Sequence, residues 1–149
     1  MRDFLLILHI VAAGTWLGAN VTQAVVTRRL TVSGGEVAAA WMRSTVAMAR
    51  YLYIPAGVLA LLTGVGLVLV SEVYEFSDVF VSVGLFTVVV GALLGSRVFG
   101  PHGERAAAAF EADDPEAGGA ATRRVAGFGM LDTALLLVTI TAMVMRWGV

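Results

Sequence analysis

The sequence contains no cysteine and no lysine, and it has only two histidines and three prolines in 149 residues. Without cysteine the chain can form no disulfide bond, no thiolate metal site and no c-type haem attachment. A metal would therefore have to bind through histidine, methionine or carboxylate side chains. The ten basic residues are all arginine and are balanced by eleven acidic residues. This charge pattern is not that of a nucleic-acid-binding protein.

Apolar residues are the most abundant class in the sequence. They make up 58% of the chain, and the mean hydropathy is +0.86. Four apolar runs are each about 20 residues long, the length that crosses a bilayer as a helix. We therefore predict an all-α, polytopic membrane protein whose residues 1–149 form one domain, a four-helix transmembrane bundle. The expected helices cover residues 4–27, 46–71, 79–99 and 125–146.

The third connection, residues 100–124, is the longest of the three. Gly100 and Pro101 are expected to end the third helix, because proline removes a backbone donor and its ring clashes with the preceding turn. A short alanine-rich helix is expected to follow and to run to Phe110. We interpret the whole segment as a solvated cytoplasmic hairpin.

Arginine is distributed unevenly among the connections. The second connection, "SEVYEFSD", has acidic residues and no basic one, and only Arg2 and Arg146 lie near the chain ends. Because basic residues concentrate in cytoplasmic loops, connections one and three are predicted to be cytoplasmic, with both termini outside. The arginines that flank these two connections are Arg28, Arg29, Arg43, Arg50, Arg97, Arg105, Arg123 and Arg124.

A polar stripe follows the first predicted helix. Positions 9, 13, 16, 20, 23 and 27 recur at steps of four and three, which places them on one helical face. An unsatisfied polar group in hydrocarbon costs several kcal/mol, so this face should point into the bundle. The stripe reads His9, Ala13, Trp16, Asn20, Gln23 and Thr27.

Asp132 lies within the fourth apolar run and belongs to an inner polar layer near the cytoplasmic side. A structural interpretation pairs it with Arg50 or Arg97, or with the side-chain amide of Asn20 or Gln23. A functional interpretation makes it part of a proton relay or ion path, because carboxyl groups inside membranes are rare and commonly functional.

His9 belongs to an outer layer, and two interpretations remain open for it. It could be a neutral imidazole that donates to a carbonyl of a neighbouring helix, or a ligand to haem iron or another metal. For the second, Gly14 and Gly18 are expected to open space and Trp16 to form the cavity wall. Met143 should return to the same leaflet, where its thioether could complete a haem b site or bind copper.

His9, Gly14 and the Trp16-Leu17-Gly18 step, followed by "YIPAGVLALLTGVGLVL" in the second helix, resemble a family of small bacterial integral membrane proteins. That family in turn resembles the CopD copper-resistance membrane domain and the HemJ-type protoporphyrinogen oxidases. The resemblance implies a multi-pass protein of the bacterial cytoplasmic (inner) membrane. It also implies a b-type haem whose ligand is the helix-one histidine, here His9.

Three functions follow as hypotheses. The first is a redox-type haem-b protein with His9 as axial ligand and Met143, or a histidine of another subunit, as the second ligand. The second is a metal or proton transport component that uses His9 and Asp132. The third is a non-catalytic assembly subunit. The lipid bilayer is the expected surrounding in each case, and a homo-oligomer or a larger membrane complex is the expected partner.

Overall fold

The computed structural model describes residues 1–33 and 35–149, and the described residues form helices joined by short turns and one longer loop. Two of the elements, η1 and η2, are single π-helical turns. The elements are α1 (Arg2–Leu30), α2 (Gly35–Met48), η1 (Ala49–Tyr53), α3 (Ile54–Leu69), α4 (Val79–Leu94), η2 (Gly95–Phe99), α5 (Gly100–Glu111) and α6 (Pro115–Val144).

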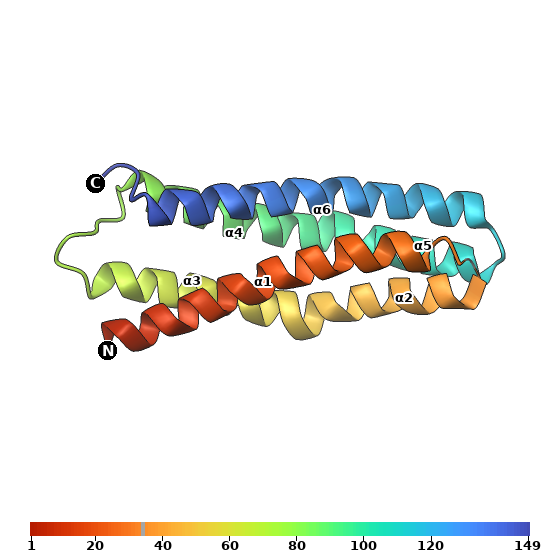
Figure 1. Cartoon of the computed structure of the whole chain (residues 1–149), viewed down its shortest axis with the longest axis horizontal. Coiled ribbons are helices and arrows are strands. Elements are labelled where there is room, and N and C mark those ends of the chain that lie inside the picture. Colours follow the sequence, from red (N-terminus) through yellow and green to blue (C-terminus); the bar gives the residue numbers. More distant parts are fainter. Residues whose placement is uncertain (34) are drawn as a thin grey trace.

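These elements build four long rods that lie side by side, with both termini at the same end of the bundle (Figure 1). In the part of the chain that the structure describes, four helices are long and apolar enough to cross a membrane: Arg2–Leu30, Gly35–Leu69, Val79–Glu111 and Pro115–Val144. The predicted all-α membrane bundle is therefore confirmed. The second rod has 35 residues, or about 52 Å at 1.5 Å per residue, against about 30 Å of hydrocarbon. The rods thus continue well beyond the apolar layer.

The helix boundaries differ from the predicted ones at the end opposite the termini. The second rod begins at Gly35 instead of residue 46, and the fourth begins at Pro115 instead of residue 125. The predicted break at Gly100-Pro101 is wrong, because the third rod continues from Val79 to Glu111. Only a short turn around residues 112–114 separates α5 from α6.

The π turns explain why Pro101 does not end the helix. The Gly100 N–H donates to the Gly95 carbonyl five residues earlier, and the Ile54 N–H donates likewise to Ala49. Each wide turn ends two positions before a proline, Pro101 or Pro55. A wider turn relieves the clash between the proline ring and the preceding carbonyl groups, so the rod continues through both sites.

The segment predicted as a solvated hairpin is in fact half buried. Phe110 is 4% exposed, and its ring lies against Gly118 of α6 so closely that a Cβ on this glycine would meet ring atoms at 2.8 to 2.9 Å. Alanine has so small a side chain that α2 and α5 can approach closely here. The buried cluster comprises Ala38, Ala39, Met42, Ala106, Ala107 and Phe110.

Candidate functional site: a buried carboxyl within the bundle

Asp132 of α6 is 2% exposed and lies in the interior of the bundle. Its Oδ2 atom accepts two hydrogen bonds from α1, one from the Trp16 indole nitrogen at 2.9 Å and one from the Asn20 side-chain amide at 2.8 Å. Trp16 and Asn20 are four residues apart, so both side chains leave α1 on the same face. The predicted contact between Asp132 and Asn20 is therefore present, and Trp16 is a second donor.

A fourth residue extends this network to the second rod. The Tyr53 hydroxyl donates to the Asn20 side-chain oxygen at 2.9 Å, which fixes the orientation of the amide so that its nitrogen faces Asp132. Tyr53 is the last residue of the π turn η1. Single π turns are frequent at functional sites because they re-aim a side chain relative to a regular helix. Here the turn belongs to the same network as the buried carboxyl.

The second oxygen of Asp132 is unsatisfied. Oδ1 is buried and has no hydrogen-bond partner among residues 1–33 and 35–149. A Cβ added to Gly91 of α4 would lie 3.5 Å from Oδ1, so this atom faces α4. A buried polar atom without a partner costs about 1 to 3 kcal/mol, and more when it is charged. Such an atom in a membrane bundle is an indication of function.

The other predicted partners of Asp132 lie elsewhere. Arg50 and Arg97 are both exposed, and Arg50 lies over the ring of Tyr51 at 6.0 Å. In the described part of the chain, the only salt bridge joins Arg43 to Glu111. The arginine alternatives for Asp132 are therefore wrong. The reason is that long basic side chains at the ends of an apolar span reach outward to water instead of inward.

Gln23 also does not reach Asp132, and its amide nitrogen instead approaches the Met48 sulfur at 3.7 Å. The next stripe residue, Thr27, accepts a 2.9 Å hydrogen bond from the indole of Trp41. All five polar residues of the stripe therefore have partners on another helix, His9 included. This confirms the prediction that the stripe faces the interior.

His9 contacts α3 in the part of the bundle nearer the termini. Its Nδ1 lies 3.0 Å from the Ala60 carbonyl oxygen and 3.1 Å from the Thr63 hydroxyl. A carbonyl only accepts, so Nδ1 carries the proton and Nε2 keeps its lone pair. The Thr63 hydroxyl itself donates to Leu59 at 2.6 Å. The imidazole is thus a donor to a neighbouring helix, and Nε2 is the nitrogen that could bind a metal.

The cavity expected around His9 has a different lining. Gly14 and Gly18 are exposed, and a Cβ on either would have nothing within 4 Å, so they lie on the outer surface of α1. The Trp16 indole donates its hydrogen bond to Asp132. The Met143 methyl group packs 2.8 Å from the Cβ position of Gly84 on α4. The residues predicted to line the cavity with His9 therefore do not converge on it.

The glycines that leave room for the side chains of α1 belong to other helices. A Cβ on Gly91 would lie 2.5 Å from the Trp16 ring, and a Cβ on Gly64 would lie 3.1 Å from His9. A further polar contact, between the Thr87 and Thr139 hydroxyls at 2.6 Å, joins α4 to α6. This pair was not predicted, because threonine in an apolar helix commonly bonds its own backbone and gives no distinct signal.

No cluster of three or more His, Asp or Glu side chains that could hold a metal ion occurs in the ranges that the structure describes. Comparison with known proteins finds no matching family model, no matching curated protein and no matching solved structure.

Proposed function

We propose that this protein is a proton transport component of the bacterial cytoplasmic membrane, in which Asp132 binds and releases a proton. The observation that carries the proposal is that Oδ1 of the buried Asp132 carboxyl group has no hydrogen-bond partner among the described residues. A proton on Oδ1 removes a charge that would be severely penalised in this interior. Oδ2 would keep its bonds to Trp16 and Asn20 in both states.

The side from which the proton exchanges follows from the bonds around the carboxyl. Trp16 and Asn20 occupy Oδ2, and neither an indole nor an amide readily passes a proton on. The Asn20–Tyr53 arm therefore holds the carboxyl in place instead of conducting. Exchange takes place at Oδ1, which faces α4 at Gly91, where the Trp16 ring packs against the helix.

The orientation that we propose places both termini outside and the arginine-bearing connections in the cytoplasm, as the positive-inside rule requires. His9 then lies in the outer leaflet and Asp132 nearer the cytoplasmic side. His9 belongs to the polar stripe of α1, and Asp132 of α6 contacts the same stripe at another depth through Trp16 and Asn20.

Infrared spectroscopy of the reconstituted protein tests the proton site directly. A protonated carboxyl has a C=O stretching band that a carboxylate lacks, and we expect such a band to be present and to disappear in Asp132→Asn. The matched control is Asp3→Asn, since Asp3 is an exposed acid on the first turn of α1. If the band is absent, or is equally strong in Asp132→Asn, the proposal is wrong.

Transport is measured in liposomes that contain a pH-sensitive dye and a potassium diffusion potential. We expect proton uptake by the wild type, loss of uptake in Asp132→Asn, and wild-type uptake in Asp3→Asn. Asparagine retains an oxygen that can accept from Trp16 and Asn20, so this variant should fold. Equal uptake by all three proteins would contradict a role of Asp132 in transport.

A second candidate function is haem b binding of redox type with His9 as axial ligand, as the resemblance to HemJ-type and CopD proteins implies. The favourable observation is the bond from Nδ1–H to the Ala60 carbonyl, because ligating histidines commonly donate their other ring nitrogen to a carbonyl. The surroundings fit less well, since Gly14, Gly18 and Met143 do not surround His9. A bound haem would supply one-electron chemistry, and the second ligand would come from another subunit or remain open. Copper would meet the same shortage of ligands.

The haem candidate is tested by absorption spectra of protein that is expressed with a supply of haem. We expect a Soret band that is lost in His9→Ala and retained in His102→Ala. His102 is the matched control because its Nδ1 likewise bonds a backbone carbonyl, that of Val98, but in α5. A spectrum without a Soret band, or one unchanged in His9→Ala, excludes the haem assignment.

A further inference from the structure

The outer surface of α1 has a feature that the bundle does not use. Gly14, Gly18, Val21 and Val25 follow one another at steps of four, three and four, so they share one face of the helix. Val21 and Val25 are about half exposed, and the two glycines are exposed with nothing within 4 Å of their Cβ positions. We call these four residues the α1 strip. Its two glycines make a shallow depression in an otherwise valine-lined surface.

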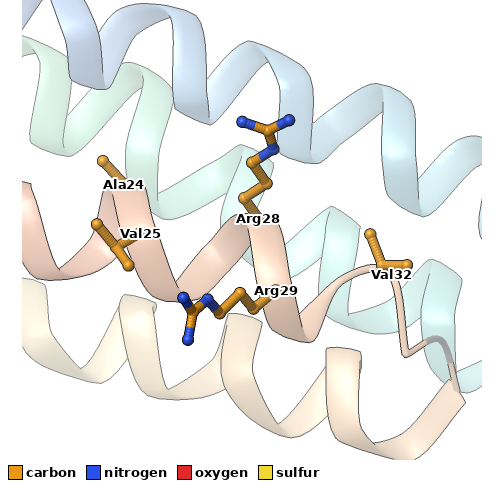
Figure 2. Close-up of a pocket in the computed structure, with 5 residues that line it drawn as sticks. All are labelled: Ala24, Val25, Arg28, Arg29 and Val32. Atoms are coloured by element: carbon orange, nitrogen blue, oxygen red, sulfur yellow. The ribbon is translucent and has the colours of Figure 1, made fainter.

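A groove of about 650 Å³ continues the α1 strip toward the end of the helix. Figure 2 shows that the side chains of Arg28 and Arg29 extend to opposite sides of α1 around it. Both arginines are exposed, and neither forms a salt bridge within the described ranges. The groove is lined by Ala24, Val25, Arg28, Arg29 and Val32.

The dimensions match one leaflet of a membrane. Arg28 lies ten positions after Gly18, which corresponds to about 15 Å along a helix. Half of a typical hydrocarbon core is also about 15 Å thick. A molecule with its charged end at the arginines and its chain along the α1 strip would therefore lie parallel to the neighbouring lipids.

We propose that the α1 strip and the groove bind one anionic phospholipid. The phosphate lies over the groove, where Arg28 and Arg29 flank it from opposite sides and attract its negative charge. One acyl chain lies along Val25 and Val21 and reaches the depression at Gly18. A bound lipid would cover the exposed glycine pair with its acyl chain and would give the two arginines, which have no acidic partners, a negatively charged group to contact.

Arg28 and Arg29 also complement the negative end of the α1 dipole, because both lie in its last turn. An interaction with the helix dipole alone would require neither the groove nor the glycines of the α1 strip. A second copy of this chain could cover the glycines, as small residues spaced by four allow close helix contact, but two arginines facing their own copies would repel each other. The lipid satisfies both the apolar and the charged part of the site.

Native mass spectrometry of the purified full chain tests the proposal, with phosphatidylglycerol added to a neutral detergent. We expect one retained lipid per chain and a retention constant roughly thirtyfold weaker in Arg28→Gln/Arg29→Gln. The matched control is Arg123→Gln/Arg124→Gln, an adjacent exposed pair on α6 with the same change of charge. Equal weakening in both double variants would show nonspecific attraction and overturn the proposal.

A second variant tests the apolar part. Gly18→Leu fills the depression at an exposed position where a Cβ has nothing within 4 Å, so it should fold and should release phosphatidylglycerol more readily than the wild type. Phosphatidylcholine should be retained less than phosphatidylglycerol, and inorganic phosphate in excess should not displace the lipid. Displacement by phosphate would identify a free-anion site instead. A dimer that Gly18→Leu dissociates, with no lipid retained, would identify a second copy as the occupant.

Discussion

The indole nitrogen of Trp16 donates to a carboxyl oxygen of Asp132, a residue 116 positions later in the chain. The same indole ring lies against Gly91, so one side chain of the first rod contacts the third and the fourth. Two helices alone cannot form this set of contacts. It forms only when α1, α4 and α6 are assembled.

Trp16→Phe should lower the free energy of unfolding by about 1 to 2 kcal/mol, because it removes one of two donors to a buried carboxyl while a ring remains against Gly91. The comparison variant is Trp41→Phe, which removes a donor to the Thr27 hydroxyl. A hydroxyl can turn to another partner, so this change should cost less. Thermal unfolding in detergent, followed by circular dichroism, measures both. A larger loss in Trp41→Phe would contradict the importance of the Asp132 network.

Gly91→Ala should destabilise the bundle by about 1 to 3 kcal/mol, since the new methyl group would overlap the Trp16 ring at 2.5 Å. Gly14→Ala is the control, because nothing lies within 4 Å of its Cβ position. Alanine is the better helix former, so this variant should be neutral or up to about 1 kcal/mol more stable. The opposite order of the two melting temperatures would show that the close approach at Gly91 is absent.

Asp132→Ala should lower stability by about 1 to 4 kcal/mol, because it leaves the donors of Trp16 and Asn20 without their acceptor. Asp132→Asn should cost less, since an amide oxygen can still accept from both. Chemical unfolding of the two variants in the same detergent provides the comparison. Equal losses would mean that the charge, and not the acceptor, holds the network together.

Phe110→Ala should cost about 3 to 5 kcal/mol, because it empties the centre of the alanine cluster against Gly118. Phe128→Ala is the control for the loss of the same ring from a site that is 41% exposed. Hydrogen exchange of α5 and of the start of α6 should rise in the first variant and stay unchanged in the second. Unchanged exchange in Phe110→Ala would mean that this end of the bundle is held by other contacts.

A reporter that is active only outside the cytoplasm should be active when fused after Val149. Eight of the ten arginines flank the connections between the first and second rods and between the third and fourth, and by the positive-inside rule this asymmetry predicts that both termini lie outside. A second kind of reporter, which is active only in the cytoplasm, should be active when it is inserted between Ala112 and Asp114. Reversed activities would invert the proposed depths of His9 and Asp132 and the leaflet of the α1 strip.

The fold was predictable because hydropathy and helix length alone determine how many times a chain crosses a bilayer. The inward direction of the α1 polar stripe was equally predictable, since its period of three and four admits one face. The sequence also places Asn20 near Asp132. It could not tell Asn20 from Arg50 as the partner, because that choice depends on the rotation of each helix and on the reach of each side chain.

The helix ends could be predicted only in part. Asp114 accepts a hydrogen bond from the Ala117 N–H at 2.9 Å, and Pro115 follows it, a sequence that is typical of a helix N-terminus. That signal was present in the sequence and marks the start of α6. The passage through Pro101 was not predictable, because a π turn has no distinct residue pattern. The outward face of Gly14 and Gly18 depends likewise on how α1 is rotated.

The unbroken rods also have a mechanical consequence. Because α5 continues through η2 from α4 without a break, and because Phe110 packs it against α6, we expect the short turn at residues 112–114 to move with the membrane-embedded part. A folded protein inserted there through matched helical linkers would be held in a fixed direction. For a chain of only 149 residues, that turn is the natural place to add a fiducial mass for electron microscopy.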